Sequence, residues 1–427
     1  MDFVKNDKKI INGWAFFDWA NSAFTLVIST AVFPPYFAEY APNMVTVFGS
    51  EIDSNSLFSY SITFAYLLIA FMTPMLSGIA DFSGRRKIFL KLFTIIGSVS
   101  CVALYIFDPE SQLFLLLMFY VLGTIGFGGG IVFYNAYLPE ISTEDQYDAV
   151  SAKGYAYGYV GSVFLLLIIL LMITFNESLG IEKKEAVKLG FILVGVWWIA
   201  FAQITFRRLP EDKSSPFSLG LLKKGFDEVK LVGRKIMTEL NTVKFLSSYF
   251  FFIAGVNVVI LLASIFAKDE LGFESSQLIL LILLLQFLAA IGAYLFAYIS
   301  DKFGNKESLM IQIFIWIGIC IAAYFTNSVA SFYIVSVFVG LVFGGIQSLS
   351  RSTYSKLISD DEIPLTSYFS FYDVLTKLAV VLGTFVFGFV NQITGNMRYS
   401  VLALSVFFVI GAIILASVKV AHAKQKT

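Results

Sequence analysis

The feature of the sequence that constrains the fold most strongly is a series of twelve apolar runs. The length of each run is close to that of a helix of about 20 residues, which spans a bilayer. An α-helix of that length crosses a hydrocarbon core about 30 Å thick. We therefore predict an all-α integral membrane protein with twelve transmembrane helices. The expected spans are residues 13–38, 57–80, 88–107, 113–137, 154–175, 187–206, 244–267, 277–299, 309–326, 331–350, 368–391 and 398–418.

The composition agrees with a chain that is surrounded by lipid. Hydrophobic residues make up 58% of the 427 residues and charged residues 14%, against about 45–50% and about 25% in soluble domains. The 30 basic and 30 acidic residues cancel, and we expect no nucleic-acid partner. Cys101 and Cys320 both lie in apolar runs without metal-ligand spacing, so we expect neither a disulfide scaffold nor a cofactor or metal.

The distribution of basic residues predicts the orientation. If the spans alternate in direction, 24 of the 30 Lys and Arg residues fall on the side of the two termini. The opposite side receives five, and Lys377 lies within a span. Because cytoplasmic loops are enriched in Lys and Arg, we expect both termini in the cytoplasm. We place the protein in the inner membrane of a bacterium, as a multi-pass monomer in the lipid bilayer.

The longest polar interruption divides the membrane part into two halves of six spans each. We expect an N-terminal half at residues 1–206, a cytoplasmic linker at residues 207–242, and a C-terminal half at residues 243–427. Ser215 and Pro216 resemble a helix start, and the apolar spacing that follows favours a basic amphipathic helix on the inner leaflet. A merely solvated linker is the alternative.

The two halves carry related motifs at the same place. The sequence after the second span is ADFSGRRK (residues 80–87), and after the eighth it is SDKFGNKE (residues 300–307). A second pair, GGIVFYNAYLPEI and GGIQSLSRSTYSKLI, begins at residues 129 and 344. Duplicated six-helix halves are typical of transporters. We expect gating loops at the first pair, formed by Asp81, Gly84, Arg85, Arg86, Asp301, Gly304 and Lys306.

These loops resemble the signature of the major facilitator superfamily between helices two and three and between helices eight and nine. Ser77, Phe82, Ala297 and Asn305 depart from it, so we do not expect its full charge relay. The resemblance implies that Asp81 meets the positive N-terminal end of the eleventh helix, near residues 367–370, when the inner gate is closed.

A narrower resemblance comes from motifs spread over nearly the whole chain. FFDWANSAF, FYNAYLPEI, GYAYGYVGS, GGIQSLSRS and FYDVLTK begin at residues 16, 133, 154, 344 and 371. They are similar to those of the vacuole-effluxer-like branch, which includes fungal autophagy-related amino-acid effluxers. The resemblance implies a secondary transporter, with an amino acid as a lead for its small-molecule substrate.

Candidate pathway residues lie on the first span. On a helix, Asp18, Ser22 and Thr25 share one face with Asn21 beside it, and the superfamily resemblance implies that this helix lines the central cavity. A carboxylate within a span costs roughly 2.5–3.5 kcal/mol on insertion scales, which favours a functional role. We expect Asp18 to couple proton movement to solute movement. The alternative is a structural Asp18 near the positive end of the helix dipole.

Other candidates lie near the inner ends of later spans: Tyr134 and Asn135 on the fourth, Gln347 and Arg351 on the tenth, and Asp373 and Lys377 on the eleventh. Arg351 suits an anionic group, although an ordinary positive-inside anchor is equally compatible with its position. Asp373 and Lys377 are four residues apart and can neutralise each other within one helix, so a structural pair is the alternative there.

We predict a secondary transporter that moves a small solute by alternating access, with proton-coupled amino-acid efflux as the leading hypothesis. The alternatives are an exporter of drugs or other metabolites and a membrane receptor or scaffold that transports nothing. The sequence contains neither a GxxxxGK[ST] phosphate-binding loop nor an HExxH motif. We therefore do not expect an enzyme.

Overall fold

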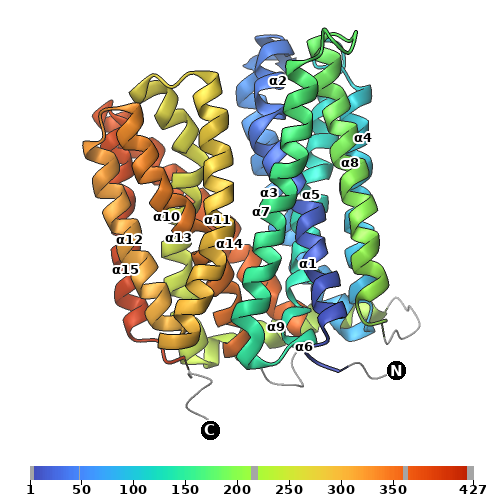
Figure 1. Ribbon diagram of the computed structural model, residues 1–427. Coiled ribbons are helices and arrows are strands. Elements are labelled where there is room, and N and C mark those ends of the chain that lie inside the picture. The colour runs from blue at the N-terminus through green and yellow to red at the C-terminus, as the bar shows by residue number, and fades with distance from the viewer. Residues whose placement is uncertain (1–3, 48, 213–219, 359–363, 421–427) are drawn as a thin grey trace. The chain divides into compact units, whose positions relative to one another are not determined.

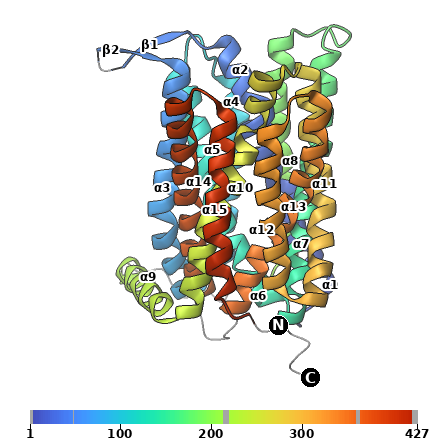
Figure 2. The same cartoon turned by 90° about the vertical axis from the view of Figure 1, so that its left-hand side faces the viewer.

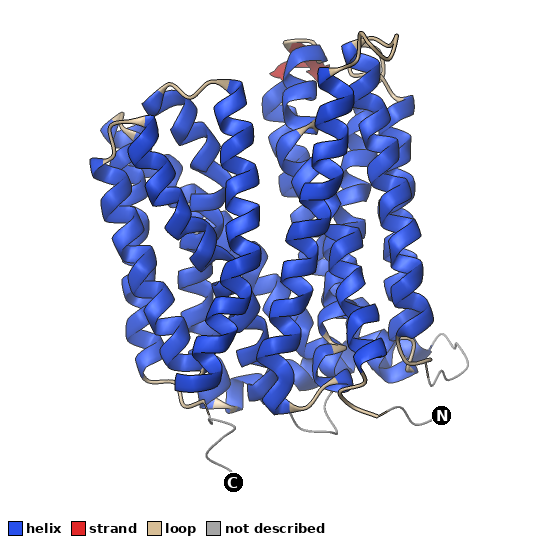
Figure 3. Ribbon diagram, in the orientation of Figure 1, coloured by secondary structure: helices blue, strands red, loops and turns tan. Residues whose placement is uncertain are grey.

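The computed structural model describes residues 4–47, 49–212, 220–358 and 364–420, and nearly all of them are helical (Figure 1, Figure 3). Twelve helical segments among the described residues are long and apolar enough to cross a membrane, which confirms the predicted fold class. The helices are α1 (Lys8–Ala23), α2 (Phe33–Tyr40), α3 (Ser54–Ser83), α4 (Arg86–Ile106), α5 (Leu113–Asn135), α6 (Leu138–Ile141), α7 (Tyr147–Thr174), α8 (Lys183–Arg208), α9 (Gly220–Thr238), α10 (Leu240–Leu271), α11 (Ser275–Phe303), α12 (Asn305–Phe325), α13 (Val329–Leu357), α14 (Leu365–Thr394) and α15 (Met397–Ala416).

The first span is built from three segments. Between α1 and α2 lies η1 (Phe24–Ala31), a π-helix, whose hydrogen bonds join residues five apart. The hydroxyl of Thr30 follows the same register and donates to the carbonyl of Thr25 at 2.8 Å. The α-helical spacing expected for the polar face therefore holds from Asp18 to Ser22, whereas Thr25 lies in the π-helical segment.

A short antiparallel hairpin separates the first and second spans (Figure 2). Strands β1 (Met44–Val47) and β2 (Ser50–Asp53) pair with Met44 opposite Asp53 and Val47 opposite Ser50. The side chain of Asp53 then accepts a hydrogen bond from the backbone N–H of Ser56 at 2.9 Å and caps α3. No pattern in the sequence predicts this hairpin.

The chain forms two compact units. Unit 1 comprises Met1–Asp7, Leu138–Ala156 and Lys230–Thr427, and unit 2 comprises Lys8–Tyr137 and Tyr157–Val229. Small residues allow the closest packing within unit 1, because a Cβ on Gly292 would collide with the carbonyl of Leu341, and one on Gly344 with that of Ala289. In unit 2, Gly126 of α5 packs in the same way on Gly97 of α4.

Helix α9 falls in the expected linker and lies beside the end of α3 rather than along the spans (Figure 2). Its first part packs on unit 2, where Gly225 contacts Gly78, and its second part packs within unit 1, where Gly233 contacts Phe371. Val232 and Ile236 are buried, while its basic side chains Lys230, Arg234 and Lys235 are exposed. The helix start expected at Ser215 and Pro216 lies outside the described residues.

Candidate functional site

In unit 2 the fold joins two of the candidate residues directly. The hydroxyl of Tyr134 on α5 donates to Oδ2 of Asp18 on α1 at 2.7 Å, and both side chains are buried. Trp14, one turn before Asp18, stacks on the ring of Tyr134 with centroids 4.5 Å apart. Its indole N–H also donates to the carbonyl of Tyr134 at 3.0 Å. The aromatic contact fixes the tyrosine so that its hydroxyl meets the carboxylate.

The amide of Asn21 is the least satisfied polar group of this region. Its side chain is 1% exposed, and neither amide atom has a hydrogen-bond partner among the described residues. It lies three residues after Asp18, beside Ser22, whose hydroxyl a Cβ on Gly158 of α7 would contact. Thr25 is half-buried and donates to the carbonyl of Ser22 at 2.9 Å, and Asn135 is also buried. An unpartnered buried amide costs about 1–3 kcal/mol, so a ligand that pairs with Asn21 recovers that free energy.

The first motif closes the end of α3 in unit 2. Gly84 has φ +65°, a left-handed conformation that glycine adopts without strain. Asp81, one turn earlier, forms an ion pair with Arg86 at 3.3 Å, and the backbone N–H of Arg85 donates to the carbonyl of Ala80 at 3.0 Å. Burial raises the pKa of Glu228 on α9, and the nearby charge of Asp81 raises it further.

In unit 1, Lys377 on α14 donates to Oδ1 of Asp373 at 2.9 Å, which is the pairing expected one turn apart. Both side chains are largely buried, and Oδ2 of Asp373 has no hydrogen-bond partner among the described residues. One carboxylate oxygen therefore remains available to a further donor. Residues 367–370, the expected partners of Asp81, lie in the first turns of α14, and their approach to Asp81 stays a prediction.

The second motif connects α11 and α12 within unit 1. Gly304 has φ +104° and allows the sharp turn between the two helices. Asp301 is exposed, and the ammonium of Lys306 donates to the carbonyl of Ala416 at 2.6 Å. Asn305, which departs from the superfamily pattern, is instead buried.

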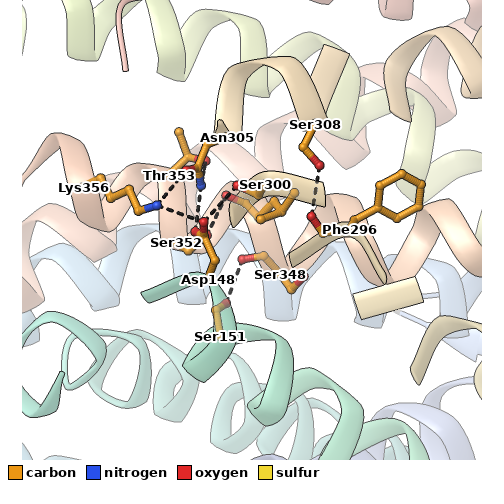
Figure 4. Close-up of polar contacts among 11 residues, drawn as sticks. Asp148, Ser151, Phe296, Ser300, Asn305, Ser308, Ser348, Ser352, Thr353 and Lys356 are labelled. Carbon is orange, nitrogen blue, oxygen red and sulfur yellow. Dashed lines mark hydrogen bonds and ion pairs between the residues drawn. The ribbon is translucent and has the colours of Figure 1, made fainter. Parts of the chain in front are cut away.

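Asn305 belongs to a buried polar cluster that no motif in the sequence predicts (Figure 4). We name it the Asp148 cluster, and its members are Asp148, Ser300, Asn305, Thr353 and Lys356. Lys356 pairs with Oδ2 of Asp148 at 2.9 Å and donates to Oδ1 of Asn305 at 2.6 Å. Ser300 and Asn305 donate to the same carboxylate at 2.9 and 2.7 Å, and Asn305 also donates to Thr353 at 3.1 Å. The start of α7 is thereby bonded to α11, α12 and α13.

Arg351, five residues before Lys356 on α13, makes the second such connection. Its guanidinium is 1% exposed and donates to the hydroxyl and carbonyl of Ser151 at 2.9 and 2.8 Å. It also lies over the ring of Tyr155, 4.2 Å from the centroid. Ser151 in turn donates to the carbonyl of Ser348 at 2.7 Å (Figure 4). This buried arginine is not exposed to headgroups, and Gln347, one turn earlier, is half-buried.

Only weak signals in the sequence mark these contacts. Asp148 and Ser151 stand at the start of the fifth span, where polar residues usually serve as helix caps. In the sequence, Lys356 is one of 24 cations on the positive side, and Asn305 stands where the superfamily has a basic residue. The bonds to Asp148 depend on packing between residues that are 152 to 208 positions apart in the sequence.

The chain is similar in sequence to known membrane proteins over nearly its whole length. Residues 6–427 match the family model described as "Vacuole effluxer Atg22 like". An uncharacterized MFS-type transporter of Bacillus subtilis, YxiO, is 31% identical over 417 residues, which cover 97% of this chain and 96% of that protein. Autophagy-related protein 22 of Vanderwaltozyma polyspora is 23% identical over 491 residues, covering 98% of this chain and 91% of that one.

Solved structures agree on the fold. The MFS proton:xylose symporter XylE, bound to 6-bromo-6-deoxy-D-glucose, superposes with a TM-score of 0.74 at 15% identity over 96% of both chains. At this identity the likeness establishes the architecture alone. Together with the family-model match over residues 6–427 of this chain, it shows a membrane transporter rather than an enzyme. The chain belongs to the vacuole effluxer Atg22-like family of major facilitator superfamily transporters.

Proposed function

We propose that this transporter exports amino acids from the cytoplasm by alternating access, in exchange for protons. The observation that carries the proposal is the buried amide of Asn21, unpartnered among the described residues, on the same helix as the buried carboxylate of Asp18. A substrate with both donors and acceptors satisfies such an amide. The family description, "Vacuole effluxer Atg22 like", supports efflux as the mode of transport.

The chemistry of a zwitterion suits the groups in each unit. In unit 2, Oδ1 of Asn21 offers an acceptor to an α-ammonium, and its amide nitrogen offers a donor to an α-carboxylate. In unit 1, the unpartnered oxygen of Asp373 and the ammonium of Lys377 offer the same two functions. Asp18 keeps a hydrogen bond from Tyr134 and is assigned to the proton rather than to the substrate.

We assign the inner gate to the Asp148 cluster and the contacts of Arg351. Leu138–Ala156 belong to the first half of the sequence, and their partners on α11, α12 and α13 belong to the second. Movement of the sequence halves apart must break these bonds. With the termini in the cytoplasm, as the distribution of Lys and Arg supports, the gate faces the cytoplasm.

Counterflow in proteoliposomes tests the cargo. Vesicles preloaded with one unlabelled solute receive a labelled trace of it, from a panel of amino acids, sugars and cationic drugs. We expect accumulation for one or more amino acids. Asn21→Leu should raise the half-saturating concentration about 10–100-fold, because losing a hydrogen bond to a charged group costs about 1.5–3 kcal/mol. Asn55→Leu, at an exposed position, is the matched control.

The outcomes separate the alternatives. Counterflow of sugars or drugs without amino acids refutes the cargo and leaves transport in place. Absence of counterflow for every solute, with protein that remains folded and correctly inserted, favours the receptor or scaffold. An unchanged half-saturating concentration in Asn21→Leu removes Asn21 from the substrate site.

A further inference from the structure

A groove with a volume of about 540 Å³ lies between α4 and α8 of unit 2. Helix α4 contributes Lys91 and Ile95, and α8 contributes Ile199, Gln203, Phe206 and Arg207, with Glu211 just beyond its end. None of the residues proposed for the substrate, the proton or the inner gate lines this groove.

Positive charges outnumber negative charges along this groove. Glu211 accepts a hydrogen bond from the buried ammonium of Lys87 at 2.7 Å, and that bond lowers the pKa of Glu211, so its carboxylate stays ionised and engaged. Lys91 lies over the ring of Phe206 at 5.8 Å. Among the described residues, neither Lys91 nor Arg207 has a carboxylate within ion-pair distance. Two cations therefore remain for an anionic ligand.

The groove also has a direction. Arg207 is the penultimate residue of α8, and Lys91 lies five residues into α4, about 7.5 Å along its axis. Both cations thus stand near the ends of two spans, at the depth of lipid headgroups. Ile95, which is 50% exposed, and the half-buried Ile199 continue from there toward the middle of the membrane. A ligand that fills the groove is charged at one end and apolar along its length.

We propose that this groove is a binding site for an anionic glycerophospholipid. Its phosphate lies between Lys91 and Arg207, and one acyl chain lies over Ile95 and Ile199. Basic pockets between transmembrane helices on the cytoplasmic side have the chemistry of anionic headgroup sites, and the proposed orientation places this groove in the inner leaflet. A soluble anion leaves the apolar walls uncovered, which favours a lipid over free phosphate.

The site connects to the first gating loop through Asp212. Its carboxylate accepts hydrogen bonds from the backbone N–H groups of Lys87 and Ile88 at 2.9 and 3.0 Å, directly after Arg86. A lipid held between α4 and α8 therefore restrains the segment in which the loop joins α4.

Native mass spectrometry of the full-length transporter tests the proposal with phosphatidylglycerol, phosphatidylethanolamine and phosphatidylcholine of identical acyl chains. We expect preferential retention of phosphatidylglycerol. The variant K91Q/R207Q should weaken its binding about 30-fold, because each interfacial cation contributes a factor of about five. The control K235Q/K302Q removes two exposed cations outside the groove and should bind as the wild type does.

Two further measurements make the test specific. In the wild-type protein, phosphatidylglycerol with a photoreactive acyl chain should crosslink to peptides containing Ile95 or Ile199. This result does not depend on whether K91Q/R207Q folds. Inorganic phosphate should not displace it. Equal retention of the three lipids, an unchanged affinity in K91Q/R207Q, crosslinks elsewhere only, or displacement by inorganic phosphate each overturns the proposal.

Discussion

Asp148 and Lys356 form a buried ion pair in which most of the remaining polar atoms also have partners. The two side chains are 9% and 7% exposed, and Asn305 serves both by donating to the carboxylate and accepting from the ammonium. A buried pair repays its desolvation only with such additional bonds. Asn305 therefore replaces a basic residue without leaving a charge unpaired, and a second cation here would lack its own anion.

The prediction at this scale is a double-mutant cycle. Asp148→Asn and Lys356→Met each leave one partner alone in a buried site, and each should lower stability by about 3–5 kcal/mol. The double variant should lose less than the sum, because it removes both charges. Apparent melting temperatures in detergent measure the effect, with Lys302→Met, an exposed lysine after Asp301, as the control. Additive losses would show that the pair does not act as a unit.

The sequence marks some polar residues clearly and others weakly. Asp18 and Asn21 stand out in the sequence because a polar group within an apolar run is rare and costly. The bond from Tyr134 to Asp18 and the bonds to Asp148 do not stand out, because they join residues 116 or more positions apart. Periodicity along one helix carries no information about its neighbour.

At the scale of elements, hydropathy alone predicted all twelve spans, since lipid requires every spanning segment to satisfy its own backbone. It did not predict the π-helix η1 or the hairpin β1–β2. A π-helix retains the apolar composition of the span and changes only the hydrogen-bond register. The hairpin lies outside the apolar runs, where length and hydropathy place no constraint on the backbone.

The distance from a glycine to the neighbouring helix predicts whether that glycine tolerates a side chain. A Cβ on Gly344 of α13 would collide with the backbone of Ala289 on α11, whereas one on Gly318 of α12 would meet no atom within 4 Å. Gly344→Ala should therefore destabilise the protein by about 1–3 kcal/mol through overpacking. Gly318→Ala should be neutral or stabilising, because alanine favours helix. Thermal unfolding of both variants decides, and equal behaviour would contradict the assigned packing.

At the scale of the whole molecule, repeated motifs and matching length relate the chain to one transporter family. The internal repeat can be recognised in the sequence because both halves retain an Asp and a Gly at the same place after their second span. The transported solute and the coupling ion cannot be predicted in this way, because they depend on a few side chains whose chemistry suits many solutes.

The proposed orientation predicts opposite labelling of two cysteines. Ser50→Cys on the exposed hairpin and Thr238→Cys at the end of α9 should react with an impermeant maleimide from outside and inside, respectively. The native Cys101 and Cys320 are buried and contribute little background. Labelling of both introduced cysteines from outside would reverse the assignment of the linker to the cytoplasm.

The central claim is that Asp18 couples protons to solute, and flux through Asp18→Asn tests it most directly. The amide keeps the shape of the side chain and can still bond to Tyr134, but it does not titrate. In proteoliposomes the variant should lose net flux driven by a pH gradient and retain exchange of substrate at equal pH. Asp269→Asn, at an exposed carboxylate on α10, should retain both. Net flux that persists under the pH gradient in Asp18→Asn would contradict the account.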